Sequence, residues 1–279
     1  MTTPFEDTYH RLLHDVMRNG VEVEVGEWQS QDVRMNPDMV SRELTHQRFE
    51  MDIPMLKSSL DDFMGATLSR PWAEDHFLER VSGYPLNPPP SEEYWPYARA
   101  RNSEHKEVDG GRFSHTYPER MWPKHANVGE TRPNGRQVFV PHNGIRYEYG
   151  DLMDVVNQLK KNLLTRQAYL PIWFPEDTGA VSGQRVPCTL GYHFLIRPER
   201  ADIVYYIRSC DLLRHFTDDV YMAARLLQWM LDQLGVSLAK SMKLVMHISS
   251  LHIFRGDYAM VTQKVKTWED QDWEYGSAF

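Results

Sequence analysis

The sequence predicts an α+β fold in which helices flank a mixed β-sheet, within a single domain spanning residues 1–279. Segments with helical spacing of apolar residues are mixed with neighbouring strand-like segments, which is typical of this class. The composition is 41% hydrophobic and 25% charged, as in ordinary globular proteins. A chain of 279 residues also buries roughly three quarters of the surface that its unfolded form exposes, so it needs no disulfide or metal to hold a core.

The first 150 residues combine helical patterns with irregular stretches. Leu12 and Val16 fall on one face of a helix that Gly20 is suited to end. Asn36-Pro37-Asp38 is suited to begin a second helix. Later stretches are dense in Pro, or rich in Gly, Pro, His and Asn without a sustained period. We therefore expect helices over residues 5–20 and 39–49, and loops over 84–97 and 102–150.

The pattern is sharper after residue 150. Apolar residues at helical spacing follow Asp151, and a second helical run ends at Gly235. Between these runs lie strand-like segments, two of which are separated only by the turn at Pro198-Glu199. We expect a helix from residue 151, strands over 167–174, 186–197 and 202–208, a helix over 219–234, and a last strand over 243–254.

Charge and cysteine content limit the partners and the setting. The net charge is −8, with 39 acidic and 31 basic residues, so a polyanion-binding surface and a nucleic-acid partner are not expected. No run of about 18 apolar residues exists, so no membrane span is expected. Two cysteines and an opening without a signal-peptide pattern favour a reducing, cytoplasmic setting. The 12 histidines show no metal-ligand spacing, so no metal is expected.

Cys188 follows Pro187 at the start of a predicted strand and has two readings. A cysteine in such a place is often a small buried apolar side chain. Arg185 lies three residues before it, and Arg208 ends the expected neighbouring strand. Cations near a thiol raise its thiolate fraction, so Cys188 is also a candidate nucleophile. Cys210 is expected to serve packing only.

The string IRSCDLLRHFTDD, residues 207–219, carries several candidate binding groups. Arg208 and Ser209 offer a guanidinium and a hydroxyl, which together suit a phosphate. Asp211 stands where the strand ends, and Asp219 stands where a helix begins. Asp219 has a structural alternative, because carboxylates are favoured at helix N-termini.

These motifs resemble the thymidylate synthase superfamily. Pro187-Cys188, the Arg-Ser-x-Asp segment at 208–211 and the Ser-Leu-His segment at 250–252 occur in that family's order. The likeness covers residues 150–258, with further similarity at 36–44 and 94–122, and is closest to the phage-type branch, deoxycytidylate hydroxymethylase. The Arg-Glu-Leu segment at 42–44 resembles the family helix that carries an acidic catalytic residue, here Glu43. Thr165-Arg166-Gln167 resembles the family's Ser-Arg-Arg phosphate motif.

The resemblance implies a thymidylate synthase-like fold, a homodimer formed through the sheet, and 5,10-methylenetetrahydrofolate as one-carbon donor. It implies that the cysteine adds to C6 of a pyrimidine nucleotide, so that the otherwise unreactive C5 attacks the one-carbon unit. In the roles that it assigns, Cys188 adds to C6 and Glu43 transfers protons. Arg208 and Ser209 bind the phosphate, together with Arg166 from a partner subunit. The remaining roles are contact with the sugar 3′-hydroxyl by His252 and contact with folate by Asp211 and Trp95.

The residue that reads the base is Asn in thymidylate synthases, and the matching position here is Asp219. An ionised carboxylate only accepts hydrogen bonds, which suits the 4-amino group of cytosine and not the 4-carbonyl of uracil. The sequence therefore predicts conversion of dCMP to 5-hydroxymethyl-dCMP, with Asp219 in the catalytic set. Thr189 after the cysteine agrees, because the cytidylate branch carries Thr there.

Two departures from the family keep alternatives open. Gln167 replaces the second arginine of the phosphate motif, and Phe254 replaces a tyrosine that shares the sugar hydroxyl with His252. The alternatives are a CMP hydroxymethylase of nucleoside antibiotic synthesis, a cytidylate C5-methyltransferase, and a nucleotide-binding homologue without catalysis. The joint presence of Cys188, Glu43 and Asp219 argues against the last, because a binding protein needs no thiol at C6.

Overall fold

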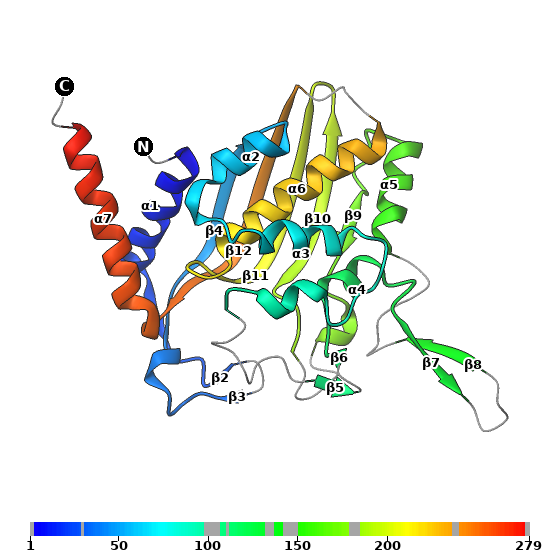
Figure 1. Ribbon diagram of the computed structural model, residues 1–279, viewed down its shortest axis with the longest axis horizontal. Helices are drawn as coiled ribbons and strands as arrows, with labels where there is room; N and C mark the ends of the chain where they lie inside the picture. The colour runs from blue at the N-terminus through cyan, green and yellow to red at the C-terminus, as the bar shows by residue number, and fades with distance from the viewer. Residues whose placement is uncertain are drawn as a thin grey trace.

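The computed structural model describes residues 3–28, 31–97, 107–109, 112–131, 137–141, 150–178, 185–235 and 240–276 (Figure 1). Its centre is a six-stranded sheet with the strand order β1-β4-β12-β11-β10-β9. The strands are β1 (Val21–Val23), β4 (Ser41–Ile53), β9 (Tyr169–Pro171), β10 (Thr189–Arg197), β11 (Arg200–Asp211) and β12 (Ser241–Phe254). Parallel and antiparallel pairs occur together, so the predicted mixed sheet and α+β class are confirmed.

The pair β11 and β12 is the parallel one. A crossover must return the chain to the same end of the sheet, and α6 (Phe216–Leu234) is that crossover. The ends of both strands and the start of α6 therefore lie at one end of the molecule.

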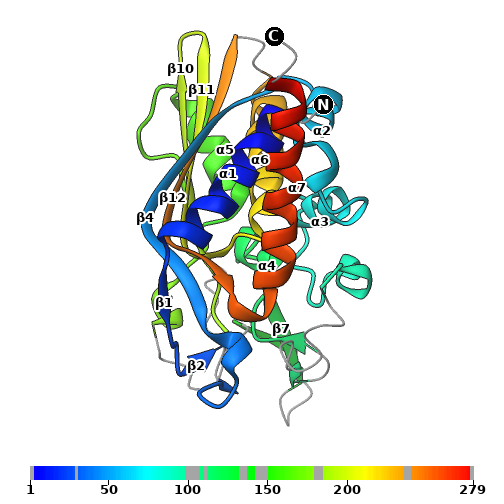
Figure 2. The ribbon, with the colours of Figure 1, turned by 90° about the vertical axis from the view of Figure 1, so that its left-hand side faces the viewer.

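The helices cover one face of the sheet. Figure 2 shows α1, α6 and α7 on the same side of the strands, and no described helix lies against the opposite face. The helices are α1 (Pro4–Asn19), α2 (Lys57–Met64), α3 (Trp72–Arg80), α4 (Tyr117–Met121), α5 (Leu152–Lys161), α6 and α7 (Tyr258–Gly276). None of the helices in the described ranges is long and apolar enough to cross a bilayer.

The helix predicted over residues 39–49 is wrong, because these residues begin the long strand β4. Phe49, Met51 and Ile53 are buried at alternate positions, which is the period of a strand with one covered face. A short 3-10 turn, Pro37–Met39, precedes the strand. Pairing with β12 along the whole length of β4 outweighs the helix-like spacing at its start.

The prediction of loops over 102–150 is also wrong in part. This segment contains the short helix α4 and the paired strands β5 (Glu107–Asp109), β6 (Arg112–Phe113), β7 (Asn127–Thr131) and β8 (Gln137–Pro141). The sequence prediction missed α2, α3 and α7, the last of which packs along α1 (Figure 1). It also placed too long a strand at 167–174, where β9 has three residues.

The other predicted elements are confirmed. α1 ends at Gly20, and α6 ends at Gly235, which takes the left-handed conformation that glycine favours. The turn between β10 and β11 places Glu199 at φ 65°. In the core, Phe5 of α1 stacks on Phe216 of α6, and Phe49 of β4 meets Phe216 edge-on at a centroid distance of 5.1 Å. These rings join the N-terminal helix, the sheet and the crossover helix.

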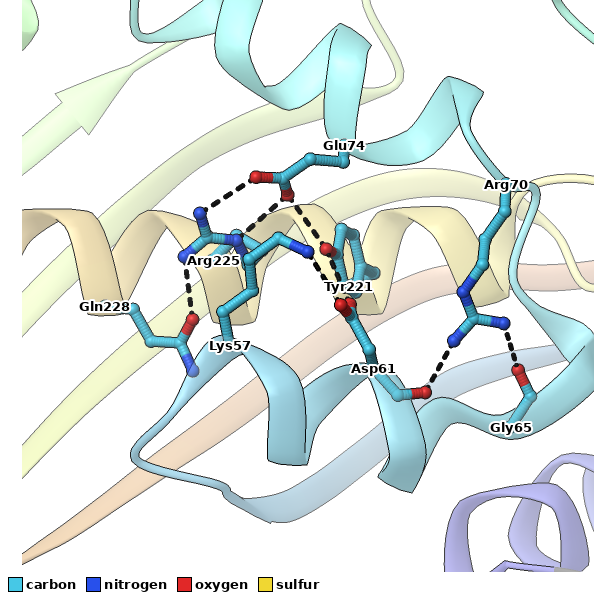
Figure 3. Close-up of polar contacts among 8 residues, drawn as sticks. All are labelled: Lys57, Asp61, Gly65, Arg70, Glu74, Tyr221, Arg225 and Gln228. Atoms are coloured by element: carbon cyan, nitrogen blue, oxygen red, sulfur yellow. Dashed lines mark hydrogen bonds and ion pairs between the residues drawn. The ribbon is translucent and has the colours of Figure 1, made fainter.

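A polar cluster fixes α6 against α2 and α3 (Figure 3). Arg225 of α6 donates to both carboxylate oxygens of Glu74 on α3, at 3.0 and 3.1 Å. The hydroxyl of Tyr221 lies 2.8 Å from Glu74 and 2.9 Å from Asp61 of α2. The Tyr221 hydroxyl therefore links α6 to both α2 and α3, although its one hydrogen can be donated to only one of the two carboxylates at a time.

Replacing Tyr221 by Phe removes that link and leaves the ring in place. We expect the free energy of unfolding to fall by about 1–2 kcal/mol, because the lost partner serves charged groups. Urea denaturation measures this loss. The control is Tyr258→Phe, whose hydroxyl lies 3.4 Å from Glu22 at an exposed site, and which should cost under about 0.5 kcal/mol. Equal losses in the two variants would contradict the role of the cluster.

Candidate active site

A cavity lies where β11 and β12 end and α6 begins. This is the end of the sheet at which the parallel pair and its crossover bring side chains together. Its walls are formed by α3, the segment before α4, the segment before β10, the ends of β11 and β12, and the start of α6. The lining residues are Trp72, His76, Arg80, Pro89, Glu92, Trp95, Phe113, Ser114, His115, Thr116, Tyr117, Arg185, Val186, Cys188, Ser209, Asp211, His215, Asp218, Asp219, Met222, His252 and Phe254.

The two cysteines differ in their surroundings. Cys188 lines the cavity and is partly exposed, whereas Cys210 is 1% exposed. Burial raises the pKa of the Cys210 thiol well above its usual value, and nearby Asp219 and Asp211 raise it further. Cys210 is therefore a protonated core side chain, and Cys188 is the thiol that a ligand in the cavity can reach.

Arg208 and Ser209, which were expected to bind a phosphate together, have different surroundings. Ser209 lines the cavity. Arg208 directs its guanidinium to the carbonyls of Pro187 (3.0 Å) and Val186 (3.2 Å), and lies over the Trp173 ring. The reason is that successive side chains of a strand point to opposite faces. Arg208 thus holds the segment before Cys188, and its backbone N–H donates to the Cys188 carbonyl at 2.9 Å.

Asp219 stands in the first turn of α6 and faces the cavity. Burial raises its pKa to about 7, and Asp218 and Asp211 add to the rise. Arg80 and a hydrogen bond from Tyr205 act in the opposite direction. A carboxylate that only caps a helix is solvated and ionised at neutral pH. Asp219 instead sits near its midpoint, which is typical of a functional group.

A hydroxyl chain connects Asp219 to the wall opposite. The Tyr205 hydroxyl that bonds to Asp219 lies 2.8 Å from Oγ1 of Thr189, which in turn donates to the Tyr117 hydroxyl at 3.2 Å. Tyr205 and Thr189 are fully buried. Because Thr189 directly follows Cys188, the thiol and the Asp219 carboxyl are held in one rigid frame.

Glu43 does not line the cavity, and it lies on a strand rather than on the predicted helix. It pairs with His252 across β4 and β12, and its Oε2 accepts from Ser250 Oγ at 2.5 Å. Ser250 Oγ also lies 3.5 Å from Nδ1 of His252, which lines the cavity. Glu43 is therefore connected to the cavity through Ser250 and His252.

Aromatic rings form one wall of the cavity. Trp95 stacks on His215 at a centroid distance of 5.4 Å and leans on Trp72 at 6.1 Å. Asp211 lies nearby, where its Oδ1 accepts the backbone N–H groups of Leu213 and Arg214. A flat ring with N–H donors fits such a wall, because it can stack on Trp95 and donate to a carboxylate.

The structure thus gathers six of the predicted site residues and separates three. Cys188, Asp219, Ser209, His252, Asp211 and Trp95 line the cavity. Glu43 and Arg208 lie behind its wall, and Arg166 is exposed in the turn between α5 and β9, where its carbonyl accepts from His193 at 3.0 Å. Within the described part of the chain, no group of His, Cys, Asp and Glu is placed to hold a metal ion.

Sequence reasoning missed the wall that α3 provides. Trp72, His76 and Arg80 recur every four residues and line the cavity. His76 Nδ1 lies 3.1 Å from Glu79, and burial lowers the pKa of His76 to about 4, so its ring is neutral. The signal was present in the spacing, because residues at i, i+4 and i+8 share one helix face. Their polarity hid it, since such a stripe ordinarily faces solvent.

Comparison with known families assigns the chain. Residues 112–272, more than half of the chain, match the family described as thymidylate synthase. No sequence among the curated proteins matches it. The matched range includes both cysteines, all of β10, β11 and β12, and the helix that carries Asp219. The chain therefore belongs to the thymidylate synthase family, whose members transfer a one-carbon unit from methylenetetrahydrofolate to a pyrimidine nucleotide.

Proposed function

We propose that the protein is a cytidine 5′-monophosphate C5-hydroxymethylase, acting on dCMP and related to the phage-type branch of the family. The observation that carries the proposal is the Asp219 carboxyl in the same cavity as the Cys188 thiol. A carboxylate accepts a hydrogen bond from the 4-amino group of cytosine, and it repels the 4-carbonyl oxygen of uracil. A base held in this way would present its ring to the thiol.

Cys188 is the proposed nucleophile. Its sulfur forms a bond to C6 of the pyrimidine, and the electron pair of the C5–C6 double bond moves to C5. Methylenetetrahydrofolate, when bound, supplies the one-carbon unit. C5 bonds to that carbon, and loss of the C5 proton together with cleavage of the bond between the carbon and the folate nitrogen leaves an exocyclic methylene on the pyrimidine. A water oxygen then adds to the methylene carbon and gives up a proton, and departure of the thiolate from C6 restores the C5–C6 double bond. The sum consumes one water and releases tetrahydrofolate.

Proton movement would run through His252. Its ring lines the cavity, and Ser250 connects it to Glu43. We propose that Glu43 acts through this chain on water near C5, because its own carboxylate has no direct access. His252 would also contact the sugar hydroxyl, because its ring lines the cavity.

Trp95 and Asp211 would hold the folate. Their geometry fits a pterin, which is flat and carries N–H donors, because a ring wall stands beside a carboxylate. The 5′-phosphate would meet Ser209 in the cavity. Arg208 lies outside the cavity and would reach the phosphate only at the cavity edge, beside the carbonyls of Val186 and Pro187 that it holds.

We propose a homodimer through the uncovered face of the sheet. Aromatic side chains gather on that face, where Tyr206 stacks on His247 at 5.3 Å and Tyr169 lies 6.3 Å from Tyr206. Tyr169 is 40% exposed, and His247 is exposed. An exposed aromatic patch of this kind would suit a twofold interface, in which the same patch of each subunit is covered. Arg166 lies at the edge of the patch, from which it would enter the partner's phosphate site.

Two alternatives share the fold and the base. Phe254 lines the cavity and meets His252 edge-on at 5.2 Å, where the family has a tyrosine hydroxyl, so a ribonucleotide substrate is the first alternative. The second is a methyltransferase, in which hydride replaces water in the last step. The mass of the product distinguishes a hydroxymethylase from a methyltransferase. Parallel reactions with CMP and dCMP show whether the substrate is a ribonucleotide or a deoxyribonucleotide.

The direct test is incubation with methylenetetrahydrofolate and dCMP, CMP or dUMP, followed by product mass. We expect a hydroxymethyl product from dCMP. Cys188→Ala should abolish turnover while nucleotide binding stays within about tenfold, because the thiol acts in bond formation. Cys210→Ala is the matched control and should turn over normally. Retained turnover by Cys188→Ala would remove Cys188 from the mechanism, and a binding protein without catalysis would give no product in any arm.

Asp219→Asn tests the base assignment. The amide adds a donor and removes a charge where the 4-substituent is read, so preference should move toward dUMP by roughly ten- to a hundredfold. The measurement is kcat/KM for dCMP and dUMP in both proteins. A ratio unchanged within about twofold would mean that Asp219 does not read the base.

Stability gives an independent readout for the same variant. In the folded protein the Asp219 carboxyl keeps its proton up to about pH 7, whereas in the unfolded chain it ionises near its ordinary value. The stability that it contributes is complete at acid pH and is lost as the pH rises through 7. Relative to wild type, Asp219→Asn should therefore gain roughly 2 kcal/mol in unfolding free energy between pH 5 and pH 8.

Shared sites predict recovery of activity between two inactive variants. Cys188→Ala and Arg166→Ala should each be inactive alone, and a mixture that forms heterodimers should regain part of the wild-type rate. One of the two sites in such a dimer carries neither substitution. Heterodimers that form but stay inactive would contradict a contribution of Arg166 across the interface.

A further inference from the structure

Arg80 is a buried guanidinium that faces the cavity without an ion-pair partner. It is the last residue of α3 and is 4% exposed. Its guanidinium carbon lies 4.0 Å from the centroid of the Tyr117 ring, and its buried Nε has no hydrogen-bond partner. Among the described residues, no carboxylate lies close enough to Arg80 to form a salt bridge.

Among the described residues, the other buried arginine, Arg120, and the half-buried Arg225 are both paired. Arg120 forms two hydrogen bonds with Asp177, at 2.8 and 2.9 Å, and Arg225 forms two with Glu74. A buried charge without a partner is costly, and packing on an aromatic face recovers only part of that cost. Arg80 therefore differs from these residues in having donors available to whatever occupies the cavity.

The carboxyl that shares the cavity with Arg80 is Asp219. The two groups attract each other, no hydrogen bond or ion pair joins them, and both line the cavity. A guanidinium only donates, and an ionised carboxylate only accepts. Together they match a ligand edge that carries a donor next to acceptors. Neutral cytosine has this edge, with the 4-amino donor beside the N3 and O2 acceptors.

We propose that Arg80 is a second base-reading residue, donating to the N3 and O2 edge of cytosine while Asp219 accepts from the 4-amino group. This inference rests on the proposed cytidylate substrate. Cytosine can then bind in its neutral form, because Arg80 supplies the positive charge opposite the carboxylate. Uracil meets two mismatches, since its N3–H faces donors and its 4-carbonyl faces the carboxylate.

The consequence is that base preference depends on Arg80 as well as on Asp219. A wrongly matched buried polar group commonly lowers affinity by roughly ten- to a hundredfold. The mismatch at Arg80 should therefore cost about as much as the mismatch at Asp219. A purely structural Arg80, held by Tyr117 and by the neighbouring carboxylates, would affect the binding of both nucleotides equally. The ratio of the two dissociation constants therefore separates the roles.

The experiment measures Kd for dCMP and dUMP in wild type, Arg80→Met and Arg80→Lys, with thermal unfolding as a check on folding. We expect Arg80→Met to weaken dCMP by roughly ten- to a hundredfold and to leave dUMP within about threefold. Arg80→Lys keeps the charge, and its point-like ammonium should still lower the preference about tenfold, because it cannot span two acceptors. If Arg80→Met does not fold, Arg80→Lys decides.

The matched control is Arg225→Met, which removes a guanidinium from the same α3–α6 contact outside the cavity and should keep the wild-type ratio. Equal loss of both nucleotides, or an unchanged ratio in the folded Arg80 variants, would overturn the inference. Failure of the proposed function is distinct, because wild type would then bind dUMP at least as well as dCMP. The wild-type ratio is measured first.

Discussion

The parallel pairing of β11 with β12 is the constraint on which the rest of the site depends. Parallel neighbours must end at the same edge of a sheet, and the connection between them must travel back along one face. That connection is α6, so its first turn stands directly beside the two strand ends. Ser209, His252 and Asp219 come from three separate elements, and this one topological requirement makes them neighbours.

The cavity concentrates charge that is poorly compensated in the protein alone. Asp218 is 3% exposed and accepts from the Ser69 backbone at 3.0 Å, yet burial still raises its pKa to about 6. Asp219 and Arg80 add a second carboxyl and a guanidinium without a bond between them. Such an arrangement lowers stability in the free protein, and a ligand with complementary groups would restore it. The polar cluster of Figure 3, away from the cavity, has its charges paired and stabilises the same helix.

The rigid frame around Cys188 has a simple origin. Arg208 holds the two carbonyls before the cysteine, and Thr189 joins the hydroxyl chain after it. The thiol therefore stands on backbone that is fixed on both sides, which limits its motion relative to the cavity. The alternation of side chains along β11 makes this possible, because it sends Arg208 away from the cavity and Ser209 into it.

The sequence by itself determined the α+β class, α1 and α6 with their glycine ends, and the β10–β11 hairpin. These follow from local signals, since periodicity, caps and turn residues act within a few positions. The candidate thiol, hydroxyl and carboxyls follow instead from the resemblance of their motifs to the thymidylate synthase family. Tertiary structure alone decided that residues 41–53 form a strand, because long-range pairing with β12 outweighs a local helical pattern. It also decided which polar side chains reach the cavity. Arg80 and His76 stand on a stripe that resembles a solvated helix face, Glu43 lies behind Ser250, and Arg208 turns to the other side of its strand. The physical reason is that the burial and charge pairing of a side chain depend on which other elements pack against it, and a single segment of the chain does not determine that packing.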